Sequence, residues 1–126
     1  MDRAQFSRAR AELGKTQAGM AELLQTSLKA IQSYEQGWRA IPAHAEKQVL
    51  FLLALKAGDA GGEECWTVLR CPPERRRRCP AWELKAGRFC WFVNGTLCGG
   101  KAQATWRDKM KICGSCRVMK SLAKFR

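Results

Sequence analysis

The sequence predicts an all-α N-terminal half followed by a small, irregular, cysteine-rich C-terminal half. Apolar residues recur at three- and four-residue intervals in the first half, which is the spacing of one helix face. All seven cysteines lie between residues 65 and 116, and the segment 57–64, AGDAGGEE, has the composition of a linker. We therefore expect a domain at 1–58, a linker at 59–64, a second domain at 65–120 and a basic tail at 121–126.

The first two predicted helices lie before residue 25. Residues 2–13 have apolar side chains at helical spacing, and Gly14 ends this helix. Thr16 has the side chain of a helix N-cap, and the apolar positions from Met20 to Leu24 again lie on one face. This pattern predicts a second helix that packs on the first.

A third helix is predicted to begin at Ser27, which has an N-cap side chain. Ile31 and Tyr34 share its apolar face, and Gly37 lies where an ending helix needs a left-handed residue. Helices this short are not stable alone, so we expect the three to pack together and against the segment that follows.

The fourth predicted helix begins after Pro42 and contains the run VLFLLAL, Val49–Leu55. This run is apolar on every side, whereas a surface helix has one apolar stripe. One face closes the helical core, and the other must be covered as well. We expect a homodimer contact through Val49–Leu55.

The run from Thr16 to Pro42, TQAGMAELLQTSLKAIQSYEQGWRAIP, resembles the Xre/Cro family of helix-turn-helix DNA-binding domains. The resemblance covers residues 1–58 and implies a lambda-repressor-like bundle that binds double-stranded DNA. An ordinary helical bundle is the alternative. The resemblance also implies a structural ion pair between Arg10 and Glu35.

This resemblance places the DNA contacts on the second and third helices or just after them, at Gln17, Ser27, Leu28, Lys29, Gln32 and Arg39. Ser27 caps the recognition helix. Lys29 and Gln32 then reach guanine and adenine in the major groove, and Leu28 lies beside them against a thymine methyl group. Gln17 and Arg39 hold the phosphate backbone.

The chain has 126 residues with 23 basic and 11 acidic side chains, a net charge of +12. Residues 59–126 hold 15 of the basic and 6 of the acidic residues, so most of the excess lies in the second half. Such an excess implies an anionic partner, in the first place nucleic acid. The start, MDRAQFSRAR, does not have the apolar core of a signal peptide, and the longest apolar run is too short to span a bilayer. We expect a cytoplasmic protein without a membrane partner.

The seven cysteines are Cys65, Cys71, Cys79, Cys90, Cys98, Cys113 and Cys116. In a reducing compartment such a cluster indicates metal binding or redox chemistry more than disulfides. Only Cys113 and Cys116 form a C-x2-C pair, which is not the pattern of a zinc ribbon. All-thiolate ligation favours an iron–sulfur cluster or zinc, and the prolines after Cys71 and Cys79 favour the cluster. Which of the seven cysteines hold metal stays open.

The stretch from Cys65 to Lys120 resembles the small bacterial two-CW domain, through its CW…GTxCGG…K…CxxC signature. The resemblance implies that all seven cysteines belong to one scaffold. Between Cys71 and Cys79 lies a run of four guanidinium groups, which is either a solvated loop or a set of phosphate contacts. The run consists of Arg75, Arg76, Arg77 and Arg78.

Nothing in the chain resembles a Ser/His/acid set, a phosphate-binding glycine loop or a pair of catalytic carboxylates, so we do not expect an enzyme. We interpret the sequence as a DNA-binding transcriptional regulator whose cysteine-rich domain binds an iron–sulfur cluster or zinc and senses redox or metal state. The alternative is a zinc-stabilised protein-interaction module, or a thiol or iron–sulfur electron-transfer protein, that carries a helix-turn-helix fold.

Overall fold

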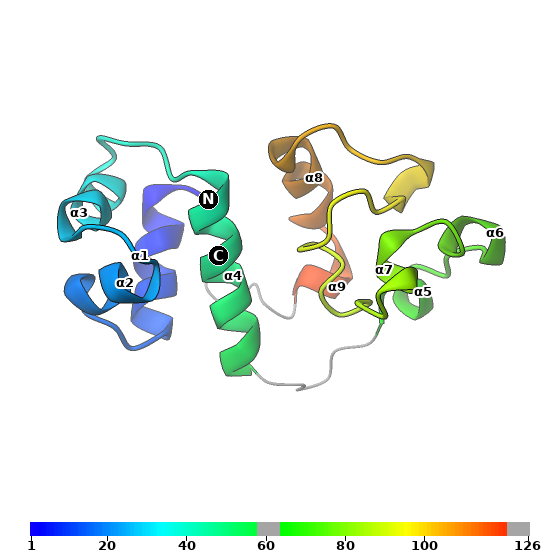
Figure 1. Cartoon of the computed structure of the whole chain (residues 1–126), viewed down its shortest axis with the longest axis horizontal. Helices are drawn as coiled ribbons and strands as arrows, with labels where there is room; N and C mark the ends of the chain where they lie inside the picture. Colours follow the sequence, from blue (N-terminus) through cyan, green and yellow to red (C-terminus); the bar gives the residue numbers. More distant parts are fainter. Residues whose placement is uncertain (58–63, 121–126) are drawn as a thin grey trace. The chain divides into compact units, whose positions relative to one another are not determined.

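A computed structural model describes residues 1–57 and 64–120, and within those ranges every regular element is helical (Figure 1). The chain divides into two compact units, whose described residues are 1–57 and 64–120. The predicted all-α character is confirmed for these ranges. The predicted linker, apart from Glu64, and the predicted basic tail at 121–126 lie outside the described residues. In the described part, none of the helices has the length and apolar composition needed to cross a bilayer.

The first unit contains α1 (Arg3–Glu12), α2 (Gln17–Leu23), α3 (Leu28–Gln36) and α4 (Ala43–Ala57). The first three helices begin at Asp2, Thr16 and Ser27, whose side chains each accept a hydrogen bond from the backbone N–H three residues further on. Gly37 ends α3 with a φ of 81°, a conformation that favours glycine. The predicted caps at Thr16 and Ser27 and the predicted end at Gly37 are confirmed.

The core of the first unit lies where α1 and α3 meet. The rings of Phe6 and Tyr34 pack edge to face with their centroids 5.6 Å apart, which joins these two helices. Met20 of α2 and Leu50 of α4 are completely buried. Contacts of α3 with both α1 and α2, and of α1 with α4, complete the unit.

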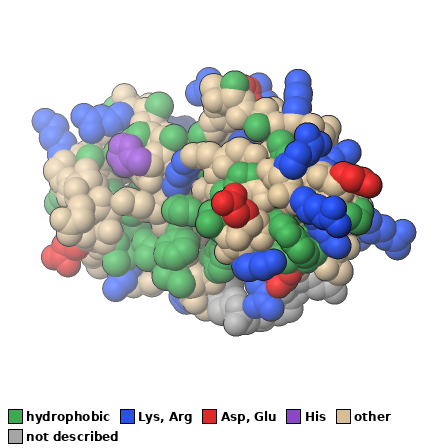
Figure 2. All heavy atoms as spheres, turned by 45° about the vertical axis from the view of Figure 1, so that its right-hand side comes forward, with side chains coloured by type: hydrophobic (Ala, Val, Ile, Leu, Met, Phe, Trp, Pro, Cys, Tyr) green, Lys and Arg blue, Asp and Glu red, His purple; other side chains and the backbone are tan. Residues whose placement is uncertain are grey.

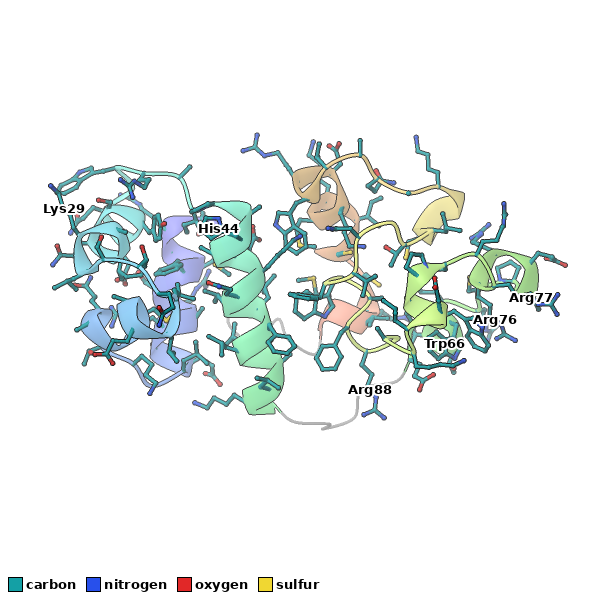
Figure 3. The ribbon with its side chains drawn as sticks, in the orientation of Figure 1. Lys29, His44, Trp66, Arg76, Arg77 and Arg88 are labelled. Atoms are coloured by element: carbon teal, nitrogen blue, oxygen red, sulfur yellow. The ribbon has the colours of Figure 1, made fainter. Side chains whose placement is uncertain are left out.

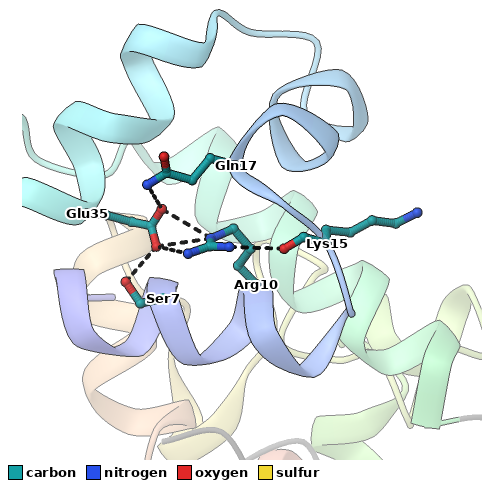
Figure 4. A network of polar contacts seen from close by, with 5 residues as sticks. All are labelled: Ser7, Arg10, Lys15, Gln17 and Glu35. Carbon is teal, nitrogen blue, oxygen red and sulfur yellow. Dashed lines mark hydrogen bonds and ion pairs between the residues drawn. The ribbon is translucent and has the colours of Figure 1, made fainter.

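A polar network holds α3 in place from one side (Figure 4). The carboxylate of Glu35 accepts hydrogen bonds from Ser7 Oγ at 2.7 Å, Arg10 Nη2 at 2.9 Å and Gln17 Nε2 at 2.8 Å. Burial raises the pKa of Glu35, but these hydrogen bonds and the charge of Arg10 outweigh it and hold the pKa below its ordinary value. The predicted Arg10–Glu35 pair is present, and Gln17 is an additional member of the network.

The apolar run of α4, Val49–Leu55, has a buried face and an exposed face. Val49, Leu50 and Leu53 are buried, whereas Phe51 and Leu55 are 37% and 57% exposed. One face of the run is therefore buried, as expected, and Phe51 and Leu55 lie on the other face. The homodimer contact stays a prediction.

The second unit is built from short helical segments joined by tight turns. They are α5 (Cys65–Val68), α6 (Pro73–Arg76), α7 (Pro80–Glu83), η1 (Cys98–Gly100), α8 (Trp106–Cys113) and α9 (Arg117–Lys120). Proline begins both α6 and α7, where its missing N–H costs nothing. α8 ends at Cys113, the first cysteine of the C-x2-C pair. A cluster of Cys65, Cys79, Ala81, Cys90 and Val118 forms the core.

The first prediction concerns the Glu35 network. We expect Glu35→Gln to destabilise the first unit by about 2 kcal/mol at pH 7, the scale of hydrogen bonds to charged groups. Because the folded-state pKa is lowered, this stabilisation is present above the ordinary pKa of glutamate and is lost as the pH falls through the folded value. The difference between the two proteins should therefore shrink below about pH 4.

The measurement is hydrogen exchange of the α1–α3 amides in urea, which reports the first unit by itself. The control is Glu22→Gln, a change of the same kind at an exposed position of α2. A pH-independent difference between Glu35→Gln and the unmodified protein would contradict the assignment.

Candidate nucleic-acid interface and thiol-lined cavity

The outer face of α3 presents the side chains that were predicted to read DNA. Leu28 is 44% exposed, and Lys29 and Gln32 are exposed beside it. Positions three and four apart are neighbours on a helix surface, so Gln32 lies next to both. Lys29 projects outward from α3 (Figure 3). Ser27 caps this helix, so its hydroxyl is bound to the Ala30 N–H at 3.0 Å.

The Gln17 side chain takes part in the Glu35 network. Its amide nitrogen donates to Glu35 Oε2, which helps to fix α3. The sequence does not show that Gln17 and Glu35 come together in space, and the phosphate contact of Gln17 stays a prediction. We assign Gln17 a role in positioning α3, and Arg39, which is exposed, is the other predicted backbone contact.

Trp38 is a surface feature that the sequence analysis missed. Its side chain is 79% exposed, although the backbone around it is fixed. The N–H groups of Trp38 and Arg39 both donate to the carbonyl of Ser33, at 3.0 and 3.3 Å. The signal was present in the sequence, because a large aromatic residue lies between the helix-ending Gly37 and the cationic Arg39. The fold thus holds an aromatic ring and a cation together at the end of α3.

All seven cysteines of the second unit line one cavity of about 380 Å³, which we call the cysteine cavity. Five segments bring them together: α5, the turns around α6 and α7, the stretch from Cys90 to η1, and the end of α8 with the turn after it. Trp66, Leu69, Trp82, Leu97 and Ile112 are among the apolar walls. Asp and Glu do not occur in its lining, which lies within residues 64–120.

Cys65 and Cys90, each of which precedes a tryptophan, are joined by a hydrogen bond between their side chains. The thiol of Cys90 donates a hydrogen bond to the sulfur of Cys65, and this bond is the largest influence holding the pKa of Cys65 below its ordinary value. The same bond, together with burial, raises the pKa of Cys90. Burial and the neighbouring Cys113 raise the pKa of Cys98 to about 11, against the opposite effect of Lys109.

The seven thiols are soft sulfur donors, which both zinc and iron–sulfur clusters take as ligands. A single zinc ion has its sulfur ligands at about 2.3 Å, so the sulfurs must lie close together. Within residues 1–57 and 64–120, no three Cys, His, Asp or Glu side chains are grouped in this way. An iron–sulfur cluster takes its thiolates at separate corners of a larger body, and it needs soft sulfur ligands in an apolar surrounding. The cysteine cavity offers both.

The arginine run between Cys71 and Cys79 does not act as one group. Arg75 and Arg76 are half-buried and line the cysteine cavity, whereas Arg77 and Arg78 are exposed. Arg77 extends outward, and Arg76 lies nearer to Trp66 (Figure 3). The four arginines thus differ in burial, and the choice between a solvated loop and phosphate contacts stays a prediction.

Basic side chains are spread over the visible face of the second unit, with hydrophobic side chains between them (Figure 2). Exposed members include Arg70, Arg77, Arg78, Lys85, Arg88 and Lys101. Lys109 is different, because it is only 6% exposed and its ammonium group donates to the buried hydroxyl of Thr96. The sequence analysis missed this buried cation.

Comparison of the chain with protein-family models, with curated proteins and with solved structures gives no match.

The second prediction concerns the thiol of Cys98 in metal-free protein. Because only the thiolate reacts with iodoacetamide, a thiol with a pKa of about 11 should react about tenfold faster with each pH unit up to pH 10. A cysteine-containing peptide is the control and should level off near pH 8.5. Mass spectrometry of the alkylated Cys98 peptide gives the rate. A plateau below pH 9 would show that Cys98 is not buried as described.

Proposed function

We propose that the protein is a sequence-specific, double-stranded-DNA-binding transcriptional regulator whose second unit binds a thiolate-ligated metal group. In this proposal α2 and α3 form a helix-turn-helix of the Xre/Cro type within a lambda-repressor-like bundle. The observation that carries it is the outer face of α3, where Leu28, Lys29 and Gln32 are exposed on a helix that the Glu35 network holds against α1 and α2. A fixed helix with exposed side chains of this kind suits the major groove.

The exposed residues of α3 and of the turn after it have different functions in DNA binding. Lys29 donates to guanine and Gln32 pairs with adenine, so these two specify sequence. Leu28 supplies an apolar contact for a thymine methyl group. Arg39 and the ring of Trp38 contact the sugar–phosphate backbone, where a cation and an apolar surface bind without regard to sequence.

The second unit contributes charge and a metal group. Its exposed Arg77 and Arg78 are available for phosphates, and the surplus of basic residues in the second half supports an anionic partner. Seven thiols around one cavity support an iron–sulfur cluster, with zinc as the other candidate. Thiols that stay reduced agree with the expected cytoplasmic location. A metal group whose loss changes DNA affinity makes the protein a redox or metal sensor.

The metal is coupled to DNA binding through the folding of the second unit. Six helical segments, five of them of three or four residues, have little stability of their own. Thiolate ligation joins the segments, so metal binding energy becomes folding energy. Without metal, the segments are joined less tightly, so the basic side chains of this unit are held less firmly in the arrangement that matches the phosphates.

A second candidate function is a metal-stabilised protein-interaction or electron-transfer module that carries a helix-turn-helix fold. It is favoured by the exposed apolar side chains of the second unit, with Leu84 at 63% and Leu69 at 43%. Binding to DNA that depends on salt and sequence separates the two candidates, because an interaction module requires neither.

The third prediction concerns sequence readout. On a site selected from random DNA, Lys29→Ala and Gln32→Ala should each cost about 1–3 kcal/mol and relax the specificity. Arg39→Ala and Trp38→Ala should weaken specific and random DNA alike, and only Arg39→Ala should lower the salt slope, by about one unit. The control is Arg8→Ala, which removes an exposed cation of α1. Equal losses on specific and random DNA from all four changes would contradict the assignment.

The fourth prediction concerns the metal. Salt titrations of binding to the selected site should give lower affinity and a shallower slope for metal-free protein, and for a variant with Cys113→Ser and Cys116→Ser, than for metal-loaded protein. Metal and sulfide analysis of protein purified without oxygen identifies the group. Identical affinities and slopes for the three proteins would mean that the cysteines serve folding or another partner.

A further inference from the structure

We propose that the arginine run is divided between two anions, with Arg75 and Arg76, together with Lys109, neutralising the thiolate-bound metal group and Arg77 and Arg78 left for DNA phosphates. The inference rests on the proposed metal site and DNA binding, and it assigns each arginine its partner.

The division follows from helix geometry. Four consecutive residues in a helical turn cover about 300° of its circumference, so their side chains cannot all face one partner. The segment α6 ends at Arg76, and Arg77 continues the turn as its cap, with φ −58° and ψ −28°. Arg75 and Arg76 are thereby turned to the cavity, and the next two residues face solvent.

Contacts within the unit hold the two inner arginines at the cavity. The guanidinium of Arg76 lies 4.5 Å from the ring centroid of Trp82, and Trp82 packs edge to face against Trp66. Arg75 Nη2 lies beside η1, 3.8 Å from the point where a Cβ of Gly100 would be. The guanidinium of Arg76 is therefore held against a wall of the cysteine cavity, and that of Arg75 lies near η1.

Arg75, Arg76 and Lys109 need a nearby anion to offset their positive charges. Four thiolates around a metal core with two positive charges leave two negative charges, and the described lining offers Arg75 and Arg76 as its charged residues. Lys109 is 6% exposed and has a neutral hydroxyl as its hydrogen-bond partner, so its charge needs a nearby anion too. A metal group with two negative charges would offset most of the charge of these three cations.

The test compares two double variants that remove the same charge. Arg75→Gln with Arg76→Gln removes the inner pair, and Arg77→Gln with Arg78→Gln removes the outer pair. Each protein is loaded with the metal that the unmodified protein carries, its metal content is measured, and the metal is then released to a chelator. A salt titration on DNA follows with loaded protein.

We expect the inner variant to release its metal at least tenfold faster and to keep the salt slope of the unmodified protein. The outer variant should release metal at the normal rate and lose about two units of slope. If the group is a cluster, the inner variant should also shift its one-electron equilibrium about tenfold toward the oxidised form, which is 59 mV. Arg75→Lys with Arg76→Lys keeps the charge and should restore both readouts, which a packing role of the guanidinium would not allow.

Three outcomes would overturn the proposal. Equal release rates and potentials for the inner and outer variants would show that Arg75 and Arg76 do not act on the metal. A loss of slope in the loaded inner variant would place them on DNA. Protein that binds neither iron with sulfide nor zinc would remove the metal site of the proposed function and this inference with it, whereas a loaded protein with unchanged release removes the inference alone.

Discussion

The carboxylate of Glu35 is the group on which the arrangement of the first unit depends. It is the acceptor for donors from α1 and from the start of α2, so one side chain fixes α3 against two other helices. A buried carboxylate without these donors would be costly, and the arrangement therefore tolerates little displacement of α3. Leu28, Lys29 and Gln32 lie on the face of α3 that points away from the core. The Glu35 network therefore also sets the direction of the proposed recognition surface.

The second unit is constrained in a different way. Its segments are too short to be stable as helices, and the buried side chains include Cys65, Cys79, Cys90 and Cys113, which are small. Trp91 and Met119 are buried as well, but a unit of this size has a small core, so in the proposed function thiolate ligation joins its segments. The cavity that the thiols surround is thus part of the fold as much as it is a site.

Local chemistry made the first unit predictable. Thr16, Ser27 and Gly37 each act on the few residues beside them, so their side chains or backbone preferences predict where the helices begin and end. Spatial neighbours were not predictable in the same way. The sequence does not show that Gln17 meets Glu35, or that Lys109 is buried. In the second half, the resemblance to the two-CW domain implied a common scaffold of cysteines, but the division of the arginine run depends on which side of α6 faces the cavity.

In the proposed function, the division of the arginine run determines how loss of the metal group changes DNA binding. When the metal group leaves, Arg75 and Arg76 lose their anion, so the unit has more uncompensated positive charge than before. This added charge does not restore specific binding, because cations on a loosened chain must be ordered again on the DNA, at about 1–2 kcal/mol per backbone residue fixed. Charges that are held in place contribute to affinity without that cost. The metal therefore strengthens specific binding by fixing Arg77 and Arg78, although it also neutralises their neighbours.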